Sequence, residues 1–187
     1  MNIILFGPPG AGKGTQSRYL LKKLNCFQVS TGDMLRDEIA KNSKIGKEIT
    51  ASMNQGKFVN DEIVNNLIKN ILLDPKKNGK LIFDGYPRSL SQAKNLDLLL
   101  ESSNQKIDFI FFLNVNKETI IKRIEKRKIL EKRSDDGSNT ILKRYDTYME
   151  TTKPVLDFYS KNPNFYEIDG TLEIDQITSK INDILQV

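Results

Sequence analysis

The residues best suited to chemistry form a glycine-rich stretch, Gly7-Pro8-Pro9-Gly10-Ala11-Gly12-Lys13-Gly14-Thr15. It follows the apolar run Ile3–Phe6, so we expect it to join a first strand to a first helix. Backbone N–H groups of such a loop turn towards phosphate oxygens, and glycines allow close approach. Lys13 can reach β- and γ-phosphates, and Thr15 can offer a hydroxyl to Mg²⁺, although the strict pattern has that hydroxyl where Gly14 stands. Nucleotide binding is favoured over the alternative, a flexible strand–helix turn.

A second candidate is Asp84, which follows the apolar run Leu81–Phe83. A carboxylate at the carboxyl end of a strand is suitably placed for Mg²⁺ or its bound waters. Taken alone, an Asp before Gly85 is more simply explained as a turn cap. With a phosphate loop on a neighbouring strand, the metal role becomes the better interpretation.

The basic residues divide into 22 Lys and 7 Arg. Arg presents a planar, permanently charged fork that grips phosphate at two points, so each Arg invites a functional explanation. Each also has a simpler one. Arg123 lies in the charged stretch Lys122–Lys128, which is typical of a solvated helix face. Arg36 can pair with an acidic neighbour such as Glu38, and Arg18 has no assigned role.

Composition narrows the function classes. The 187 residues suit one compact domain, and 38% hydrophobic with 28% charged residues is a soluble, globular balance. No secretory signal and no apolar run of roughly 18 residues is visible, so we expect a cytoplasmic protein without a membrane partner. The single Cys26 and the absence of His exclude an internal disulfide, a cysteine-cluster zinc site and imidazole catalysis. A lysine-rich solvated surface explains the net charge of +5 better than nucleic-acid binding.

Continuous apolar runs alternate with segments of helical periodicity, which predicts an α/β fold with strands buried on both faces of a parallel sheet. The expected strands are Ile3–Phe6, Phe27–Val29, Leu81–Phe83, Phe109–Val115 and Phe165–Ile168. Two polar stretches fit this core poorly and are expected to be insertions over one edge of the sheet, Thr31–Val59 and Lys126–Gly137.

Several motifs together resemble the adenylate kinase family. They are Gly7–Thr15, Ser30-Thr31-Gly32-Asp33-Met34-Leu35-Arg36, Asp84-Gly85-Tyr86-Pro87-Arg88 with Gln92, Arg123, Arg127, Arg133-Ser134-Asp135-Asp136, Arg144 and Asp169-Gly170-Thr171. The resemblance implies a P-loop NTPase-type three-layer α/β fold, with a five-stranded parallel sheet flanked by helices. The core would comprise residues 1–29, 60–125 and 137–187, with a helical insert for the monophosphate at 30–59 and a short lid at 126–136. The lid has neither room nor ligands for zinc.

The resemblance also assigns roles. ATP would be held by Gly10, Ala11, Gly12, Lys13, Gly14, Thr15, Arg127 and the backbone near Leu172. AMP would be held by Thr31, Arg36, Lys57, Val59, Gly85, Tyr86, Pro87, Arg88, Gln92, Arg133 and Arg144. The catalytic set would be Lys13, Arg88, Arg123, Arg127, Arg133 and Arg144. Mg²⁺ bound with ATP would meet Asp84, through water, and Thr15. Two departures concern the acceptor pocket and the lid: Phe58 stands where Leu is usual, and Lys128–Lys132 lacks the typical Gly and Pro.

The implied activity is reversible transfer of the terminal phosphoryl group of MgATP to AMP, giving two ADP, in purine nucleotide and energy homeostasis, by a monomer. The nearest alternative is a UMP or CMP kinase, but Thr31 and Gln92 favour adenine because a Gln amide can pair with that base's donor–acceptor edge. A GTPase-like switch would need an Asn-Lys-x-Asp stretch, which is absent. A nucleic-acid-binding module would leave the phosphate loop unexplained.

Overall fold

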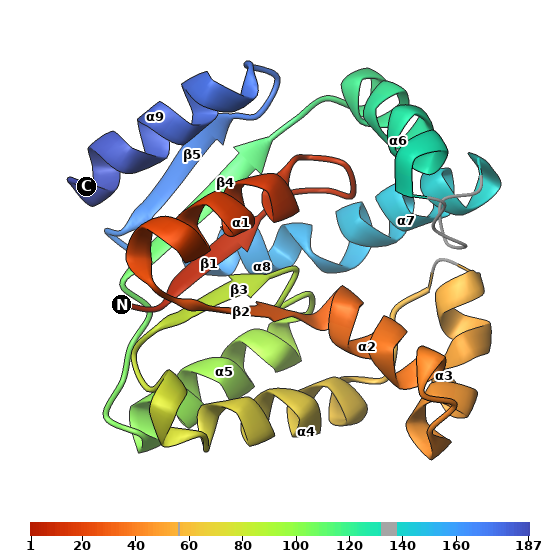
Figure 1. Ribbon diagram of the computed structural model, residues 1–187, viewed down its shortest axis with the longest axis horizontal. Coiled ribbons are helices and arrows are strands. Elements are labelled where there is room, and N and C mark those ends of the chain that lie inside the picture. Colours follow the sequence, from red (N-terminus) through yellow and green to blue (C-terminus); the bar gives the residue numbers. More distant parts are fainter. Residues whose placement is uncertain (56, 132–137) are drawn as a thin grey trace.

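The computed structural model describes residues 1–55, 57–131 and 138–187, with the backbone alone described at 127–131, 138–139 and 141. Its centre is a five-stranded parallel sheet in the order β2-β3-β1-β4-β5 (Figure 1). The strands are β1 (Ile3–Phe6), β2 (Phe27–Ser30), β3 (Leu81–Asp84), β4 (Phe109–Asn114) and β5 (Phe165–Asp169). The predicted α/β fold with five parallel strands is confirmed, and each strand's bounds agree with the sequence to within one residue.

Helices surround this sheet in the described residues. They are α1 (Lys13–Leu24), α2 (Thr31–Ala40), α3 (Lys44–Asn54), α4 (Asp61–Leu72), the short 3₁₀ helix η1 (Pro75–Lys77), α5 (Leu90–Ser102), α6 (Lys117–Glu131), α7 (Ser138–Thr151), α8 (Lys153–Tyr159) and α9 (Ile174–Leu185). None of the described helices is long and apolar enough to cross a membrane.

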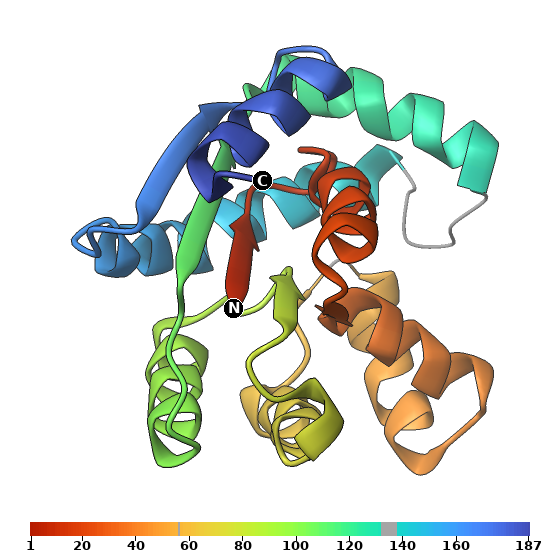
Figure 2. The same ribbon diagram turned by 60° about the vertical axis from the view of Figure 1, so that its left-hand side comes forward.

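Alternate residues of the strands divide between two apolar layers, because successive side chains of a strand point to opposite faces. Ile3 and Leu5 join buried side chains of α1, α6 and α9 in one layer. Ile4 and Phe6 join buried side chains of α4, α5 and α8 in the other. Figure 2 shows α1 and α9 on one side of the sheet and α4 and α5 on the other. Strand β1 is therefore apolar throughout, and the fold has three layers.

Strand β1 lies at the centre of the sheet, with β3 on one side and β4 on the other. The connection from β1 leads to β2 on one side, whereas the connection from β3 leads to β4 on the other, so a crevice forms at the carboxyl ends of these strands. The register pairs Leu5 with Asp84 and with Phe111, which brings the loop after β1 beside the end of β3. The fold thereby places the glycine-rich loop and Asp84 next to each other.

Local sequence explains where several helices begin. Side chains of Ser30, Ser43, Asn60 and Ser89 accept backbone N–H bonds at the starts of α2, α3, α4 and α5, as expected of residues with short polar side chains. Helix α1 differs: its N-cap is Gly12, with φ of 97°, and no side chain caps it. Its first N–H groups are not occupied by a side-chain cap.

The stretch Thr31–Val59 contains α2 and α3 and no strand in its described residues. Figure 1 shows these two helices extending from the sheet beyond the end of β2. Ser30 ends β2 and also caps α2, so the chain leaves the sheet for this segment without an intervening loop.

Candidate active site

The glycine-rich loop wraps around the start of α1. Lys13 begins that helix, and its Nζ donates hydrogen bonds to the carbonyl oxygens of Gly7 at 2.7 Å and Pro8 at 3.0 Å. Gly10 has φ of 82°, and a Cβ there would lie 2.8 Å from Cγ1 of Ile124. Glycine is therefore required by both backbone conformation and space. The loop holds a lysine ammonium beside an uncapped helix N-terminus, a combination that attracts anions.

The carboxylate of Asp84 lies beside this loop. Its Oδ2 accepts a hydrogen bond from Nε2 of Gln28, on β2, at 3.1 Å. A Cβ added to Gly14 would lie 3.6 Å from the same oxygen, so the carboxylate faces the first turn of α1. A carboxylate oxygen at this position is a donor that suits a hard cation such as Mg²⁺. Among the described residues, no three His, Cys, Asp or Glu side chains gather into a metal cluster.

A cavity opens on the other side of the crevice, between α2, α4 and the turn after β3. It is lined by Thr31, Gly32, Leu35, Arg36, Met53, Lys57, Phe58, Val59, Val64, Arg88, Gln92 and Arg144. Apolar side chains form part of its wall, and four cationic side chains stand around it. An apolar wall with charged groups at its edge suits a flat, partly apolar molecule that carries a negative group.

The carbonyl oxygen of Gly85 is an anchor for this cavity. It accepts a hydrogen bond from Oγ1 of Thr31 at 2.9 Å and another from Nε of Arg88 at 2.6 Å. The guanidinium of Arg88 also lies over the ring of Phe58, 5.1 Å from its centroid, a favourable cation–π geometry. Arg36 forms an ion pair with Asp33, with Nη2 and Oδ1 2.5 Å apart. These contacts orient the cationic side chains around the cavity.

A second cavity joins the two regions. It is lined by Leu5, Phe6, Gly7, Pro9, Lys13, Phe58, Gly85, Pro87, Arg88, Arg144, Tyr148 and Thr152. Arg88 and Arg144 therefore line both cavities, and Lys13 lies in the second. Oγ1 of Thr152 donates to the carbonyl oxygen of Arg88 at 3.2 Å, which ties α8 to the turn carrying this arginine. The arrangement brings three cations to one space between the loop and the first cavity.

Known proteins resemble this chain over its full length. Residues 5–164 match the family model described as adenylate kinase. An adenylate kinase from Pelagibacter ubique is 50% identical over 213 aligned positions, covering the whole of both chains. One from Mycoplasma mycoides is 40% identical over 215 positions, again with both chains covered in full. One from Archaeoglobus fulgidus is 36% identical, covering this chain completely and 98% of the relative.

The chain belongs to the adenylate kinase family. It is therefore a phosphotransferase, and the P-loop fold expected from the resemblance is confirmed. Adenylate kinases bind nucleotides, and both cavities lie between the glycine-rich loop and the insert.

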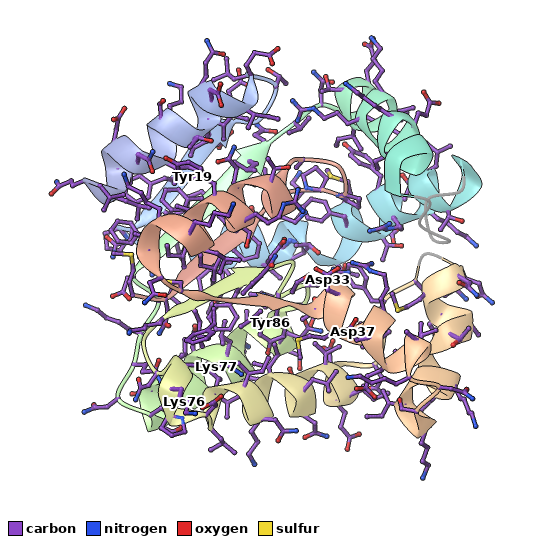
Figure 3. All side chains as sticks on the ribbon, viewed as in Figure 1. Tyr19, Asp33, Asp37, Lys76, Lys77 and Tyr86 are labelled. Carbon is purple, nitrogen blue, oxygen red and sulfur yellow. The ribbon has the colours of Figure 1, made fainter. Side chains whose placement is uncertain are left out.

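Most residues that the sequence assigned to the acceptor lie together. Thr31, Arg36, Lys57, Val59, Arg88, Gln92 and Arg144 line the first cavity, and Gly85 and Pro87 line the second. Tyr86 is different: it is fully buried and lines neither cavity. Figure 3 shows it beneath the sheet, on the side of α4 and α5. Its hydroxyl donates to Oδ1 of Asn65 at 3.0 Å and to the carbonyl oxygen of Gln92 at 3.3 Å.

The remaining predicted residues are more dispersed. Nη1 of Arg123 donates to the carbonyl oxygen of Gly170 at 2.7 Å, so this arginine lies at the turn after β5, outside both cavities lined by Arg88. Leu172 lies in the same turn region and lines a separate cavity between β5 and α9. Arg127 is on α6, where only the backbone is described, and Arg133 lies outside the described residues.

Sequence reasoning overlooked several side chains of the site. Gln28 contacts Asp84, and Tyr148 lines the second cavity. Asp61 and Ser89 form hydrogen bonds that hold Gln92. Asp61 resembles an ordinary acidic residue in the first turn of a helix, and Ser89 an ordinary N-cap. No sequence signal distinguishes them from such residues, because their partners are about thirty positions away along the chain.

Proposed function

We propose that this adenylate kinase family member transfers the terminal phosphoryl group of MgATP to AMP, reversibly, giving two ADP. One observation carries the proposal: Arg88 and Arg144 line both the cavity that contains Thr31 and Gln92 and the cavity that contains Lys13. An acceptor phosphate in the first cavity and a donor phosphate beside Lys13 would share the same cations. Two nucleotides meeting at one cationic space is the arrangement that direct transfer needs. The role would be purine nucleotide and energy homeostasis.

On the donor side, the loop residues Gly10 to Thr15 would hold the ATP phosphates through backbone N–H groups. Lys13 would neutralise charge on the transferring group. The uncapped start of α1 supports this role, because its N–H groups and dipole favour an anion. Arg127 and the backbone near Leu172 would complete the ATP site.

On the acceptor side, the cavity lined by Thr31, Lys57, Val59 and Gln92 would hold the AMP base and ribose. The cationic residues Arg36, Arg88, Arg133 and Arg144 would face its phosphate. Tyr86 would act through its hydrogen bonds to Asn65 and Gln92, because its side chain is buried. Gly85 and Pro87 would shape the turn beneath the nucleotide.

Mg²⁺ would accompany ATP. Asp84, near the first turn of α1, and Thr15 would hold it directly or through water, and Gln28 supports the Asp84 carboxylate. The ion would neutralise charge on the β- and γ-phosphates. No zinc is part of the proposal, since the only cysteine is Cys26 and the chain has no His.

The chain's own contribution to the rate would be positioning and electrostatics. Lys13, Arg88 and Arg144 would align donor and acceptor and stabilise the charge that spreads over the moving group. Arg123, at the turn after β5, and Arg133 would add to this set. No protein base is needed, because the acceptor phosphate oxygen is already ionised.

Water must be excluded, since hydrolysis of ATP competes with transfer. We infer that a closing lid at 126–136, lined with arginines, would do so; its residues 132–136 lie outside the described residues.

The first test is a coupled assay for ADP formed from MgATP and AMP, comparing the unaltered chain with Arg88→Ala. We expect kcat to fall about 10³-fold, because a cation facing the transferring phosphoryl group is lost. ATP binding should change little, since the loop is intact. Arg18→Ala is the matched control, because Arg18 is on the exposed face of α1 and should keep full activity. Equal activity of the Arg88→Ala and unaltered proteins would refute the mechanism.

The second test compares AMP, CMP, UMP and GMP under saturating MgATP. The highest kcat/KM is expected with AMP, and faster turnover of CMP would replace the proposed acceptor.

The proposal also includes a cytoplasmic monomer without a nucleic-acid partner. Size-exclusion chromatography with light scattering tests the first property, and a titration with DNA across salt concentrations tests the second.

A further inference from the structure

The side-chain amide of Gln92 has one orientation in this fold. It is buried, with 2% of its surface exposed. Its Oε1 accepts the backbone N–H of Arg88 at 2.7 Å, and its Nε2 donates to Oδ1 of Asp61 at 2.6 Å. If the amide were reversed, its NH₂ would face an N–H donor and its oxygen would face a carboxylate. Both contacts would be repulsive, so the two partners fix which end carries the oxygen.

Asp61 is itself held in place. Its second oxygen, Oδ2, accepts a hydrogen bond from Oγ of Ser89 at 2.6 Å. Ser89 in turn accepts the backbone N–H of Gln92 at 3.2 Å as the N-cap of α5. Asp61 is the first residue of α4, directly after the N-cap Asn60. The carboxylate therefore links the beginnings of two helices to one amide, and both of its oxygens are used.

These contacts leave part of the amide's hydrogen-bonding capacity unused. A carboxamide has two N–H donors and two lone pairs on its oxygen. One donor goes to Asp61 and one lone pair to Arg88, so one N–H and one lone pair remain. Gln92 lines the acceptor cavity. A ligand edge with a ring acceptor beside an amino donor matches this pair, as in a 6-aminopurine. A 6-oxopurine presents a ring N–H beside a carbonyl oxygen, which is the reverse pattern.

We propose that Asp61 is a specificity-determining positioning residue: by fixing the Gln92 amide through its carboxylate, it selects 6-aminopurine over 6-oxopurine monophosphates. This inference rests on the proposed function, because it concerns the acceptor of that reaction. Asp61 lines neither cavity and acts through Gln92. Without its carboxylate, the amide could turn over for a 6-oxo base at the cost of the Arg88 contact alone. A site with fixed polar groups rejects the wrong pattern because buried donors or acceptors are left unpaired.

A structural alternative would make Asp61 only a tie between α4 and α5. In that case the loss of its carboxylate would lower the stability of the protein and weaken the binding of AMP and IMP equally. The selectivity between two bases of nearly the same shape separates the two roles. IMP is a suitable competitor to AMP, because it differs from AMP at the edge in question and adds no group elsewhere.

The experiment measures kcat and KM for AMP and IMP under saturating MgATP, and the inhibition constant of IMP against AMP. The proteins are the unaltered chain, Asp61→Asn and the matched control Glu62→Gln. Asn keeps the shape of Asp but can offer either an oxygen or an NH₂ to Gln92. We expect the AMP/IMP ratio of kcat/KM, or of affinity, to fall about tenfold in Asp61→Asn, as for one hydrogen bond. The change should appear in KM, with kcat nearly unchanged.

Glu62 is exposed and shares the first turn of α4, so Glu62→Gln removes a similar charge without touching Gln92. The AMP/IMP ratio of kcat/KM for Glu62→Gln should equal that of the unaltered chain. In a Gln92→Leu background, Asp61→Asn should leave the ratio unchanged, because the amide through which it acts is gone. If Asp61→Asn does not fold, Ser89→Ala removes the hydrogen bond on the other oxygen and should lower the ratio in the same direction.

An AMP/IMP ratio that stays within twofold in Asp61→Asn overturns the inference. An equal loss of activity with AMP and with IMP, together with a lower melting temperature of the variant, also overturns the inference. If the unaltered chain phosphorylates neither AMP nor IMP, the proposed function is refuted instead. The two failures are therefore distinguishable in the same set of measurements.

Discussion

The phosphate loop and the acceptor cavity are built in different ways. The loop is local: Lys13 donates to Gly7 and Pro8, only a few residues away, and the first turn of α1 follows at once. The acceptor cavity depends on hydrogen bonds between distant segments, such as Asp61 to Gln92 and Thr152 to Arg88. In the proposed function, the donor site would use mainly backbone groups and the acceptor site mainly oriented side chains.

This difference matches what each region has to recognise. A triphosphate is a flexible, highly charged chain, and N–H groups of a loop can surround it whatever base is attached. A purine base has a fixed pattern of donors and acceptors, which only oriented side chains can match. Changes to the loop should therefore affect transfer as a whole. Changes to the acceptor cavity should affect which acceptor binds and how tightly.

The largest effect is expected from Lys13→Met, which would test whether the loop's ammonium serves transfer itself. We expect kcat to fall about 10³-fold with the fold intact, because a preorganised charge at the reacting group is removed. KM for AMP should remain unchanged. Steady-state kinetics and circular dichroism measure both, with Lys22→Met on the exposed last turn of α1 as the control. An equally large loss of AMP affinity would mean that the two regions are not separable.

A smaller effect is expected from Gly85→Ala on the acceptor side. Gly85 has φ of 75°, and a Cβ there would lie 2.9 Å from Nη2 of Arg88. Displacing this guanidinium and straining the turn should raise KM for AMP about tenfold, from a cost of about 1–2 kcal/mol. KM for ATP should not change. Gly79→Ala is the control, because its φ of 64° brings the same strain in an open position away from the cavities. A larger change in KM for ATP than for AMP would contradict the division drawn above.

The smallest effect is expected from Asp97→Asn, further along α5 than Gln92. Burial raises the pKa of Asp97, although a hydrogen bond from the hydroxyl of Tyr159 opposes this. Between the ordinary Asp value and the raised one, the unfolded chain loses its proton first, so this group makes stability fall as pH rises. Asp97→Asn should remove that slope and stabilise the protein at neutral pH by about 0.5 kcal/mol or less, because the carboxylate is partly solvated.

Urea unfolding of Asp97→Asn and the unaltered chain between pH 4 and pH 7 measures this slope. KM values for AMP and ATP should be the same in both proteins, since Asp97 lines neither cavity. A change in the AMP/IMP selectivity of this variant would show that orientation of the acceptor side chains depends on α5 as a whole. The distinction between a local loop and a specific side-chain network would then need revision.

Much of the fold could be predicted because strands buried on both faces leave a strong signal. Ile3–Phe6, Leu81–Phe83 and Phe109–Asn114 are nearly continuous apolar runs, and the structure places all of them in the sheet. The position of Tyr86 was less readable: the motif containing it suggested contact with the acceptor, while its ring packs in the core. A motif indicates a location but not which way each side chain points.

The sequence alone determined the phosphate loop, the alternation of strands with helices and the membership of the family, because all three depend on residues that are close together or on short motifs. Only the tertiary structure revealed that Arg88 and Arg144 border two cavities at once and that Asp61 orients Gln92. Those facts depend on segments brought together by the sheet and its helices. Their physical basis is hydrogen-bond geometry, which requires the two partners' positions in space and leaves no pattern in the order of residues.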